Sequence, residues 1–412
     1  MKVLMINKFI YPKGGDAICS LETRRLLVEH NHNVVLWGMH HSNNPKLPFD
    51  DYFVKYIDFD NIKGIKNRMK AVVSILYSFE AKAKITYVLK SFKPDIVHLN
   101  NFAHQISPSI LHAIKNERIP MVMTMHDYKL VCPAYSMFSN SGCCEECRGR
   151  RYYRCIINRC AKNSYSKSTI NCLEMYLHHD IMGIYNLIDI FIAPSFFLKN
   201  EVEEMGFNLP VTYLPNFIDS KNYQPQYEFT KGIFCYFGRL SPEKGIFTML
   251  KAFAAKSAKL RIIGDGPLGE EINSMIKKEG LNNVEMLGYK SGDELQKSIK
   301  ESMAVIIPSE CYENNPRSAL EAFALGKPVI GARIGGIPEL VIDGETGLTF
   351  KSGDEQDLSK KINCLMSNSD MVMKMGKIAR KTVEQKYNSE NHYRNLLAIY
   401  NNAINNSEIN IE

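Results

Sequence analysis

The chain has 412 residues, 45% of them hydrophobic, and a formal net charge of +7. Its length exceeds what one hydrophobic core usually organises, and its apolar content is that of a globular protein, so we expect two domains. No apolar run approaches the ~18 residues of a membrane span and the first eight residues lack the pattern of a signal peptide, which predicts a soluble cytoplasmic protein with reduced thiols.

Short apolar segments alternate with helical patterns along the chain, as in βα units that build parallel sheets. The first group of predicted strands comprises Lys2–Asn7, Asn33–Trp37, Asp95–Leu99, Met121–Met125, Asp189–Ala193 and Val211–Leu214. The second group comprises Gly232–Phe237, Lys259–Gly264, Val284–Leu287, Ala304–Pro308 and Pro328–Gly331. We therefore expect an α/β protein with two doubly wound domains, residues 1–215 and 231–380, joined by a polar linker at 216–230 and followed by a helix and tail at 381–412.

Two adjacent glycines follow the first predicted strand and precede a helical pattern. At Gly14 and Gly15 the backbone can approach a ligand closely because no Cβ stands in the way, although a plain turn also explains the pair. The sequence here is not the Gly-x-Gly-x-x-Gly of a dinucleotide-binding fold, which argues against NAD.

Two histidines lie on predicted strands of the first domain. His126 follows Met121–Met125 at its carboxyl end, where a side chain points into a cleft more often than into the core. His98 lies inside Asp95–Leu99, and we expect it to be a hydrogen-bonded core residue.

Seven of the eleven cysteines lie between residues 132 and 172. In a cytosolic protein this density favours metal binding over disulfides. Cys144 and Cys147 have the spacing of half a zinc knuckle, and Cys132 and Cys160 are the expected second pair of a structural zinc site. Free thiols in an extended loop are the alternative.

Positive charge is concentrated in the first 200 residues, which hold 26 Lys and Arg against 16 Asp and Glu. One cationic run contains no acidic residue and is interleaved with tyrosines: Arg148, Arg150, Arg151, Arg154, Arg159, Lys162 and Lys167. Such a surface suits anionic lipid headgroups, an acceptor pyrophosphate or nucleic acid, and a merely solvated surface is an equal alternative.

Two cations flank a glycine-bounded loop after the strand Gly232–Phe237. Arg239 and Lys244 lie five residues apart at the carboxyl end of this strand, where a diphosphate is the ligand that they could neutralise. Two unrelated surface cations are the alternative.

Two carboxylates lie on either side of a predicted helix start. Asn315 is the expected N-cap and Pro316 the first helical residue, which places Glu313 in the loop before the helix and Glu321 inside it. In an open α/β sheet this edge binds phosphorylated ligands. We interpret both carboxylates as acceptors for sugar hydroxyls rather than as an acid/base pair.

These motifs, above all Glu313-x7-Glu321 followed by Ala322-Phe-Ala-Leu-Gly-Lys-Pro-Val-Ile330, resemble the retaining family-4 nucleotide-sugar glycosyltransferases. The resemblance implies a GT-B fold, in which two Rossmann-like domains face a central cleft, with a Cys-rich insertion at about 130–172 and a final helix that crosses back to the first domain. The segment Glu313-Asn-Asn-Pro316 departs from the usual family pattern, which has Gly or Ser followed by an aromatic residue and Gly.

The same resemblance implies transfer of a glycosyl group from a UDP- or GDP-sugar, without a divalent metal, to a hydroxyl of a glycan or lipid-linked oligosaccharide in envelope polysaccharide synthesis, such as lipopolysaccharide or capsule. By resemblance, the catalytic residues are His126, Arg239, Lys244 and Glu313. Donor-binding residues would be Gly14, Gly15, Gly238, Tyr289, Asn314, Asn315 and Glu321. Together with the positive charge, the resemblance predicts peripheral contact with the anionic inner face of a membrane.

Two alternatives stay open. A sugar-nucleotide epimerase or a phosphorylase of similar fold is the nearest enzyme. A basic, zinc-containing nucleic-acid-binding protein is the alternative from another class, but it leaves Arg239, Lys244 and both glutamates unexplained, so we expect no nucleic-acid partner.

Overall fold

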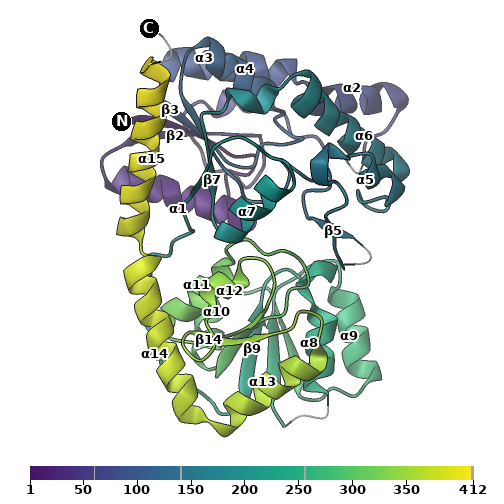
Figure 1. The fold of residues 1–412 in the computed structure, drawn as a ribbon, viewed down its shortest axis with the longest axis vertical. Coiled ribbons are helices and arrows are strands. Elements are labelled where there is room, and N and C mark those ends of the chain that lie inside the picture. Colours follow the sequence, from purple (N-terminus) through teal and green to yellow (C-terminus); the bar gives the residue numbers. More distant parts are fainter. Residues whose placement is uncertain (60, 140–141, 255–256, 410–412) are drawn as a thin grey trace.

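The computed structural model describes residues 1–59, 61–139, 142–254 and 257–409, and in it the chain forms two lobes that lie end to end (Figure 1). The first lobe contains a parallel sheet in the order β2-β1-β3-β4-β7-β8. Its strands are β1 Lys2–Ile6, β2 Asn33–Trp37, β3 Ile96–Leu99, β4 Met121–Thr124, β7 Ile190–Ala193 and β8 Val211–Tyr213. Helices cover both faces, so β3 and β7 are buried throughout, and β7 is a continuous apolar run.

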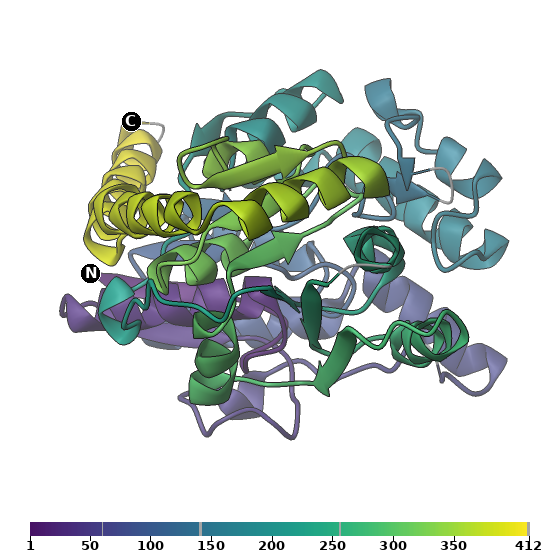
Figure 2. The same cartoon turned by 90° about the horizontal axis from the view of Figure 1, so that it is seen from below.

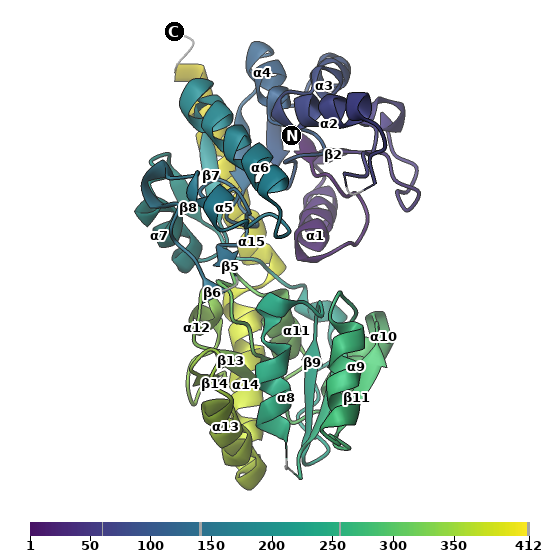
Figure 3. The same cartoon turned by 90° about the vertical axis from the view of Figure 1, so that its right-hand side faces the viewer.

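The helices of the first lobe connect these strands. They are α1 Gly15–Glu29, α2 Ile65–Leu76, α3 Phe79–Phe92, α4 Ser109–Asn116, α5 Arg154–Ile157, α6 Tyr165–Tyr176 and α7 Phe196–Glu204. Between β4 and β7 the Cys-rich segment forms the short antiparallel pair β5 Phe138–Ser139 and β6 Gly142–Cys143, then α5 and α6. Figure 3 shows β5 and β6 next to the second lobe.

The second lobe contains a parallel sheet in the order β11-β10-β9-β12-β13-β14. Its strands are β9 Ile233–Phe237, β10 Lys259–Ile263, β11 Val284–Gly288, β12 Ala304–Ile307, β13 Val329–Ala332 and β14 Gly347–Phe350. Its helices are α8 Ile246–Phe253, α9 Gly269–Lys278, α10 Gly292–Lys300, α11 Arg317–Ala324, α12 Ile337–Leu340 and α13 Glu355–Ser367. All eleven predicted strands are present, and β14 and the short pair β5 and β6 are additions.

The last two helices connect the lobes along one side of the molecule (Figures 1 and 2). α14 Ser369–Lys386 packs on α11, and α15 Ser389–Ile409 returns to the first lobe. There Leu396 and Tyr400 belong to the first core. None of the helices in the described part of the chain is long and apolar enough to cross a membrane.

Candidate active site

In a parallel sheet, a ligand-binding crevice forms where two neighbouring strands are connected to helices on opposite sides of the sheet. In the second sheet β9 lies between β10 and β12, and the connections from β9 and β12 leave in opposite directions. Loops after the carboxyl ends of such strands form the crevice where open α/β sheets bind ligands. Arg239 and Lys244 follow β9, and Glu313 follows β12, so the fold brings these three predicted residues to one crevice.

Lys244 and Glu313 form an ion pair in this crevice. The Lys244 Nζ lies 2.5 Å from Glu313 Oε1, and the Ser309 hydroxyl donates to the same oxygen at 2.6 Å. Burial opposes the charge of Lys244, but the adjacent Glu313 carboxylate outweighs it and raises the pKa of the ammonium. Burial likewise favours the neutral form of Glu313, yet Lys244 and Ser309 hold the pKa of this carboxyl below its usual range. Both groups are therefore charged at neutral pH.

Arg239 differs from Lys244 in its surroundings. Its side chain is exposed and forms no ion pair with any described carboxylate, while its carbonyl accepts a hydrogen bond from the Tyr236 hydroxyl at 2.8 Å. The backbone at Arg239 is thus held in place and its guanidinium is available to an anionic ligand. Tyr289 is also exposed, at 69%, beyond the end of β11.

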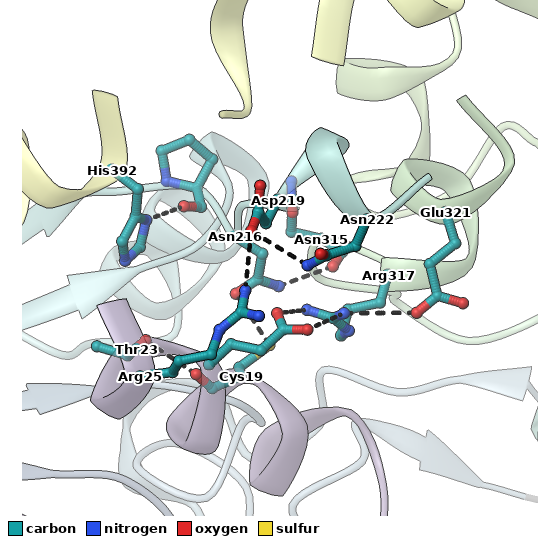
Figure 4. A network of polar contacts seen from close by, with 12 residues as sticks. Cys19, Thr23, Arg25, Asn216, Asp219, Asn222, Asn315, Arg317, Glu321 and His392 are labelled. Atoms are coloured by element: carbon teal, nitrogen blue, oxygen red, sulfur yellow. Dashed lines mark hydrogen bonds and ion pairs between the residues drawn. The ribbon is translucent and has the colours of Figure 1, made fainter. Parts of the chain in front are cut away.

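The start of α11 differs from the prediction by one residue. The helix begins at Arg317, Pro316 occupies the N-cap position with extended backbone, and no side chain caps the helix. Asn315 is therefore not the N-cap: its buried Oδ1 accepts no hydrogen bond from the described part of the chain, while its carbonyl accepts from the Asn216 side-chain amide at 2.9 Å. Glu321 lies inside the helix as predicted, with Arg317 one turn before it (Figure 4).

The first lobe contributes a second set of side chains at the ends of β1, β3 and β4. His126 is half-buried, and its Nε2 lies 2.9 Å from Asn100 Oδ1. Burial lowers the pKa of His126 despite nearby Asp16 and Asp127, so the imidazole is neutral at neutral pH. Gly14, with a φ of 130°, precedes α1, which begins at Gly15. His126, Asn100 and Asp127 line one small cavity.

His98 is a core residue, as predicted. Its Nδ1 lies 2.6 Å from the Tyr400 hydroxyl of α15 and its Nε2 lies 2.8 Å from Thr124 Oγ1. Burial lowers the pKa of His98 to about 3, which keeps the ring neutral. This side chain helps to hold α15 against the first sheet.

Asn314 connects the two lobes directly behind Glu313. Its Nδ2 donates to the Met125 carbonyl at 3.1 Å, and its Oδ1 accepts from the Ser195 hydroxyl at 2.7 Å. Both ends of the amide are therefore engaged with the first lobe. This contact places the loop of Glu313 next to the strand end that carries His126, and it gives Asn314 a role between the lobes that the sequence did not predict.

The segment Gly335–Glu339 also lies at this edge and contacts both lobes. The backbone of Gly336 packs so closely on the Asn314 carbonyl that a Cβ would collide with it, and the Gly336 amide donates to the Glu313 carbonyl at 2.7 Å. Glu339 accepts from the first two backbone amides of α7, Phe196 at 3.0 Å and Phe197 at 2.6 Å. In the sequence, a Gly335-Gly336 pair before a helical pattern is a weak signal for such a contact, because a simple turn explains it equally well.

The predicted cysteine quartet gathers around one small cavity. Cys132, Cys144, Cys147 and Cys160 line it together with Cys155. Burial raises the pKa of Cys132 to about 11, so this thiol is neutral. Within the described ranges, however, no three Cys, His, Asp or Glu side chains are placed to hold a metal ion. The expected clustering is present, but its geometry is not that of a zinc site.

The Cys-rich segment also contacts the loop that carries Glu313. The Tyr312 hydroxyl donates to Glu145 Oε1 at 2.7 Å, and the Cys143 thiol donates to the Glu310 carbonyl at 3.4 Å. The Cys-rich segment therefore lies against the candidate site rather than apart from it.

The cationic run is partly neutralised by acids that lie outside it in sequence. Arg148 pairs with Glu145 at 2.7 Å and with Glu204 at 3.3 Å, and Arg150 pairs with Asp180 at 2.6 Å. The charge expected from an uninterrupted run is therefore reduced in the folded protein.

Known families and structures match nearly the whole chain. A family model described as Glycosyltransferase Family 4 matches residues 13–222, and one described as Glycosyl transferases group 1 matches residues 219–382. An uncharacterized glycosyltransferase of Methanocaldococcus jannaschii is 30% identical over 188 residues, which are 46% of this chain and 52% of that protein. Lipopolysaccharide 1,2-N-acetylglucosaminetransferase of Salmonella typhimurium is 30% identical over 224 residues, which are 48% of this chain and 58% of the relative. The matched region thus spans about half the length of these curated relatives.

Among solved structures, sucrose-phosphate synthase from Thermosynechococcus elongatus has a TM-score of 0.71 at 17% identity and covers 97% of this chain and 98% of its own. Anabaena HepE in complex with UDP-glucose has a TM-score of 0.64 at 17% identity, over 98% of this chain and 100% of its own. These likenesses confirm the two-domain GT-B fold that the sequence predicted.

Proposed function

The chain belongs to glycosyltransferase family 4, and from this premise we propose that it transfers a glycosyl group from a nucleotide diphosphate sugar to a hydroxyl, with retained configuration. The observation that carries the proposal is the Lys244–Glu313 pair at the ligand-binding edge of the second sheet. A cation for the diphosphate and a carboxylate for the sugar hydroxyls lie side by side there. The HepE complex with UDP-glucose supports a UDP-sugar as the donor.

In this proposal the protein acts mainly by electrostatics. Lys244 and Arg239 stabilise the charge that develops on the departing diphosphate, so protein cations rather than a divalent metal bear it. Glu313 orients the donor sugar by accepting from its hydroxyls, and neutral His126 positions the sugar from the first lobe. Glu321 accepts from the ribose hydroxyls. Because the diphosphate is already a good leaving group, a glycosidase-type pair of carboxylates is not needed.

A transfer assay with Lys244→Ala tests the proposal. Removing one charge-assisted contact that strengthens as the leaving group departs should cost about 2–4 kcal/mol in the barrier, so turnover at saturating donor should fall by about 30-fold to 10³-fold. Lys251→Ala, at an exposed position of α8 in the same lobe, is the matched control and should keep wild-type turnover. If Lys244→Ala kept nearly wild-type turnover, Lys244 would not bind the diphosphate and the proposed site would be wrong.

We further propose that the acceptor is a glycan or a lipid-linked glycan of an envelope polysaccharide, presented at an anionic membrane surface. The similarity to a lipopolysaccharide N-acetylglucosaminetransferase supports the acceptor class. The surface of α2 supports the membrane contact: Ile65, Met69 and Val73 recur every fourth residue and are 77%, 65% and 53% exposed. Cations flank them at Lys63, Lys66, Arg68 and Lys70, and residues 62–79 contain no Asp or Glu. An exposed apolar stripe with flanking cations suits an anionic lipid surface.

A further inference from the structure

Arg317 lies at the boundary between the lobes, beside the nucleotide side of the candidate site. Its Nη1 and Nη2 donate to the two carboxylate oxygens of Glu22 on α1, at 2.6 and 2.9 Å. The same Nη2 lies 3.4 Å from Glu321 Oε1, one helical turn away. Figure 4 shows Arg317 between α1 and Glu321. Two carboxylates from different lobes thus share one guanidinium.

Arg317 contacts Glu22 more closely than Glu321, and all three side chains are largely buried. The Arg317 side chain is only 10% exposed, and Glu22 and Glu321 are 25% and 18% exposed. Removing one partner of such a desolvated ion pair leaves a buried charge unpaired, which is costly, so the remaining group is stabilised by pairing with another nearby charge. Glu22 holds Arg317 by two short parallel hydrogen bonds, the strongest geometry for this pair. The contact with Glu321 is long and single, and Glu321 Oε2 makes no hydrogen bond to any described residue.

We propose that Glu22 is a positioning residue for nucleotide binding: by holding Arg317 it keeps Glu321 free to accept from the ribose hydroxyls. Without Glu22, the guanidinium would pair fully with Glu321 and compete with the ribose. Because Glu22 lies on α1 of the first lobe, nucleotide affinity in the second lobe depends on the docking of the first. This inference rests on the proposed role of Glu321 in donor binding.

The charged groups around Glu321 predict a distinctive pH dependence. Burial raises the pKa of Glu321, Arg317 lowers it and Glu22 raises it, with a net increase over the usual value. Tyr223 also faces this carboxyl, and Cys19 faces Arg317. Since only the ionised carboxyl accepts from both ribose hydroxyls, nucleotide affinity should fall on acidification. A full Arg317–Glu321 pair in Glu22→Gln would move this fall to lower pH, a shift that general loosening of the lobes would not cause.

Calorimetric titration with UDP tests the inference, with GDP as the probe if wild-type protein prefers it. Glu22→Gln should weaken binding about tenfold at neutral pH, equivalent to about 1.4 kcal/mol. The double variant Glu22→Gln/Arg317→Met should recover most of that loss, because the competing cation is gone. Arg25→Gln is the matched control: Arg25 also lies on α1 and reaches Asp219 at 3.1 Å, but does not contact Glu321. Its affinity should stay at the wild-type level.

Wild-type affinity in Glu22→Gln, or a double variant that binds no better than the single one, would overturn the inference. If Glu22→Gln does not fold, Glu22→Asp serves instead, since its carboxylate is one methylene short of the two-bond contact. A wild-type protein that binds neither UDP nor GDP would count against the proposed function itself, which is a distinguishable result.

Discussion

The two glutamates that flank the start of α11 have opposite electrostatic surroundings. Lys244 and Ser309 hold the pKa of Glu313 below its usual range, whereas burial holds the pKa of Glu321 above it. Glu313 is therefore ionised well into the acid range, and Glu321 gains a proton more readily. Different tasks follow from this difference: a fixed acceptor beside the diphosphate cation, and an acceptor whose charge depends on Arg317.

Alanine variants of the two glutamates should therefore separate binding from transfer. Glu321→Ala removes the ribose acceptor and should weaken affinity for the free nucleoside diphosphate about tenfold, in line with one lost charge-assisted contact of about 1.5 kcal/mol. Glu313→Ala should leave that affinity within a factor of about two and instead reduce turnover or alter the choice of donor sugar. Titration calorimetry and a transfer assay on the same preparations measure both. An equal loss of nucleotide affinity in the two variants would contradict this division of roles.

For single residues, local burial could be predicted from the sequence, but long-range contacts could not. The core role of His98 could be predicted because it lies in the middle of an apolar strand, although its partner Tyr400 is 302 residues away. The predicted N-cap at Asn315 was wrong: the helix starts one residue later, and Asn315 instead contacts Asn216, a long-range contact that local patterns do not encode. The Glu22–Arg317 pair was missed for the same reason, since its members are separated by 295 residues.

Among the elements, the Cys-rich segment between β4 and β7 contains most of the cysteines of the chain. Its thiols converge on one cavity, and its neighbours Cys143 and Glu145 contact the loop of Glu313. Because no three ligands converge within the described ranges, we predict that protein purified without added metal is folded and active with far less than one zinc per chain by elemental analysis. Cys147→Ser should leave the metal content unchanged, as should Cys364→Ser at an exposed cysteine outside the cluster. About one zinc per chain that is lowered in Cys147→Ser alone would instead establish a structural zinc site.

The surface of α2 and the cationic run are two candidate surfaces for contact with an anionic membrane. Replacing Ile65, Met69 and Val73 with serine should abolish most binding to anionic vesicles in a sedimentation assay, because these side chains are the exposed apolar contacts. Replacing Arg150, Arg151 and Arg154 with glutamine should weaken it less, since Arg150 is already paired with Asp180. Binding should fade as the Debye length shrinks from ~30 Å at 0.01 M salt toward ~8 Å at 0.15 M. Equal sedimentation with neutral and anionic vesicles would identify both surfaces as merely solvated.

At the scale of the whole molecule, the periodic features could be predicted and the long-range ones could not. Apolar runs bounded by helical patterns identified the strands, because parallel strands buried on both faces carry an unmistakable apolar signal. β14 was not predicted from the sequence because Gly347–Phe350 is short and contains glycine and threonine. The contacts between the lobes, through Asn314, Glu339 and Arg317, depend on how two separately folded sheets meet. No single segment of the sequence carries that information.

Lys244, Glu313 in the loop before α11 and Glu321 within α11 should together bind a nucleotide diphosphate sugar. A thermal-shift panel of UDP-, GDP- and ADP-sugars, run on wild-type protein and on Lys244→Ala, measures this binding. One donor at 100 times its Kd should stabilise the wild-type protein by about 2.7 kcal/mol, and the same concentration should stabilise Lys244→Ala clearly less. Stabilisation of neither protein by any member of the panel, or equal stabilisation of both by the same sugar nucleotide, would contradict the account.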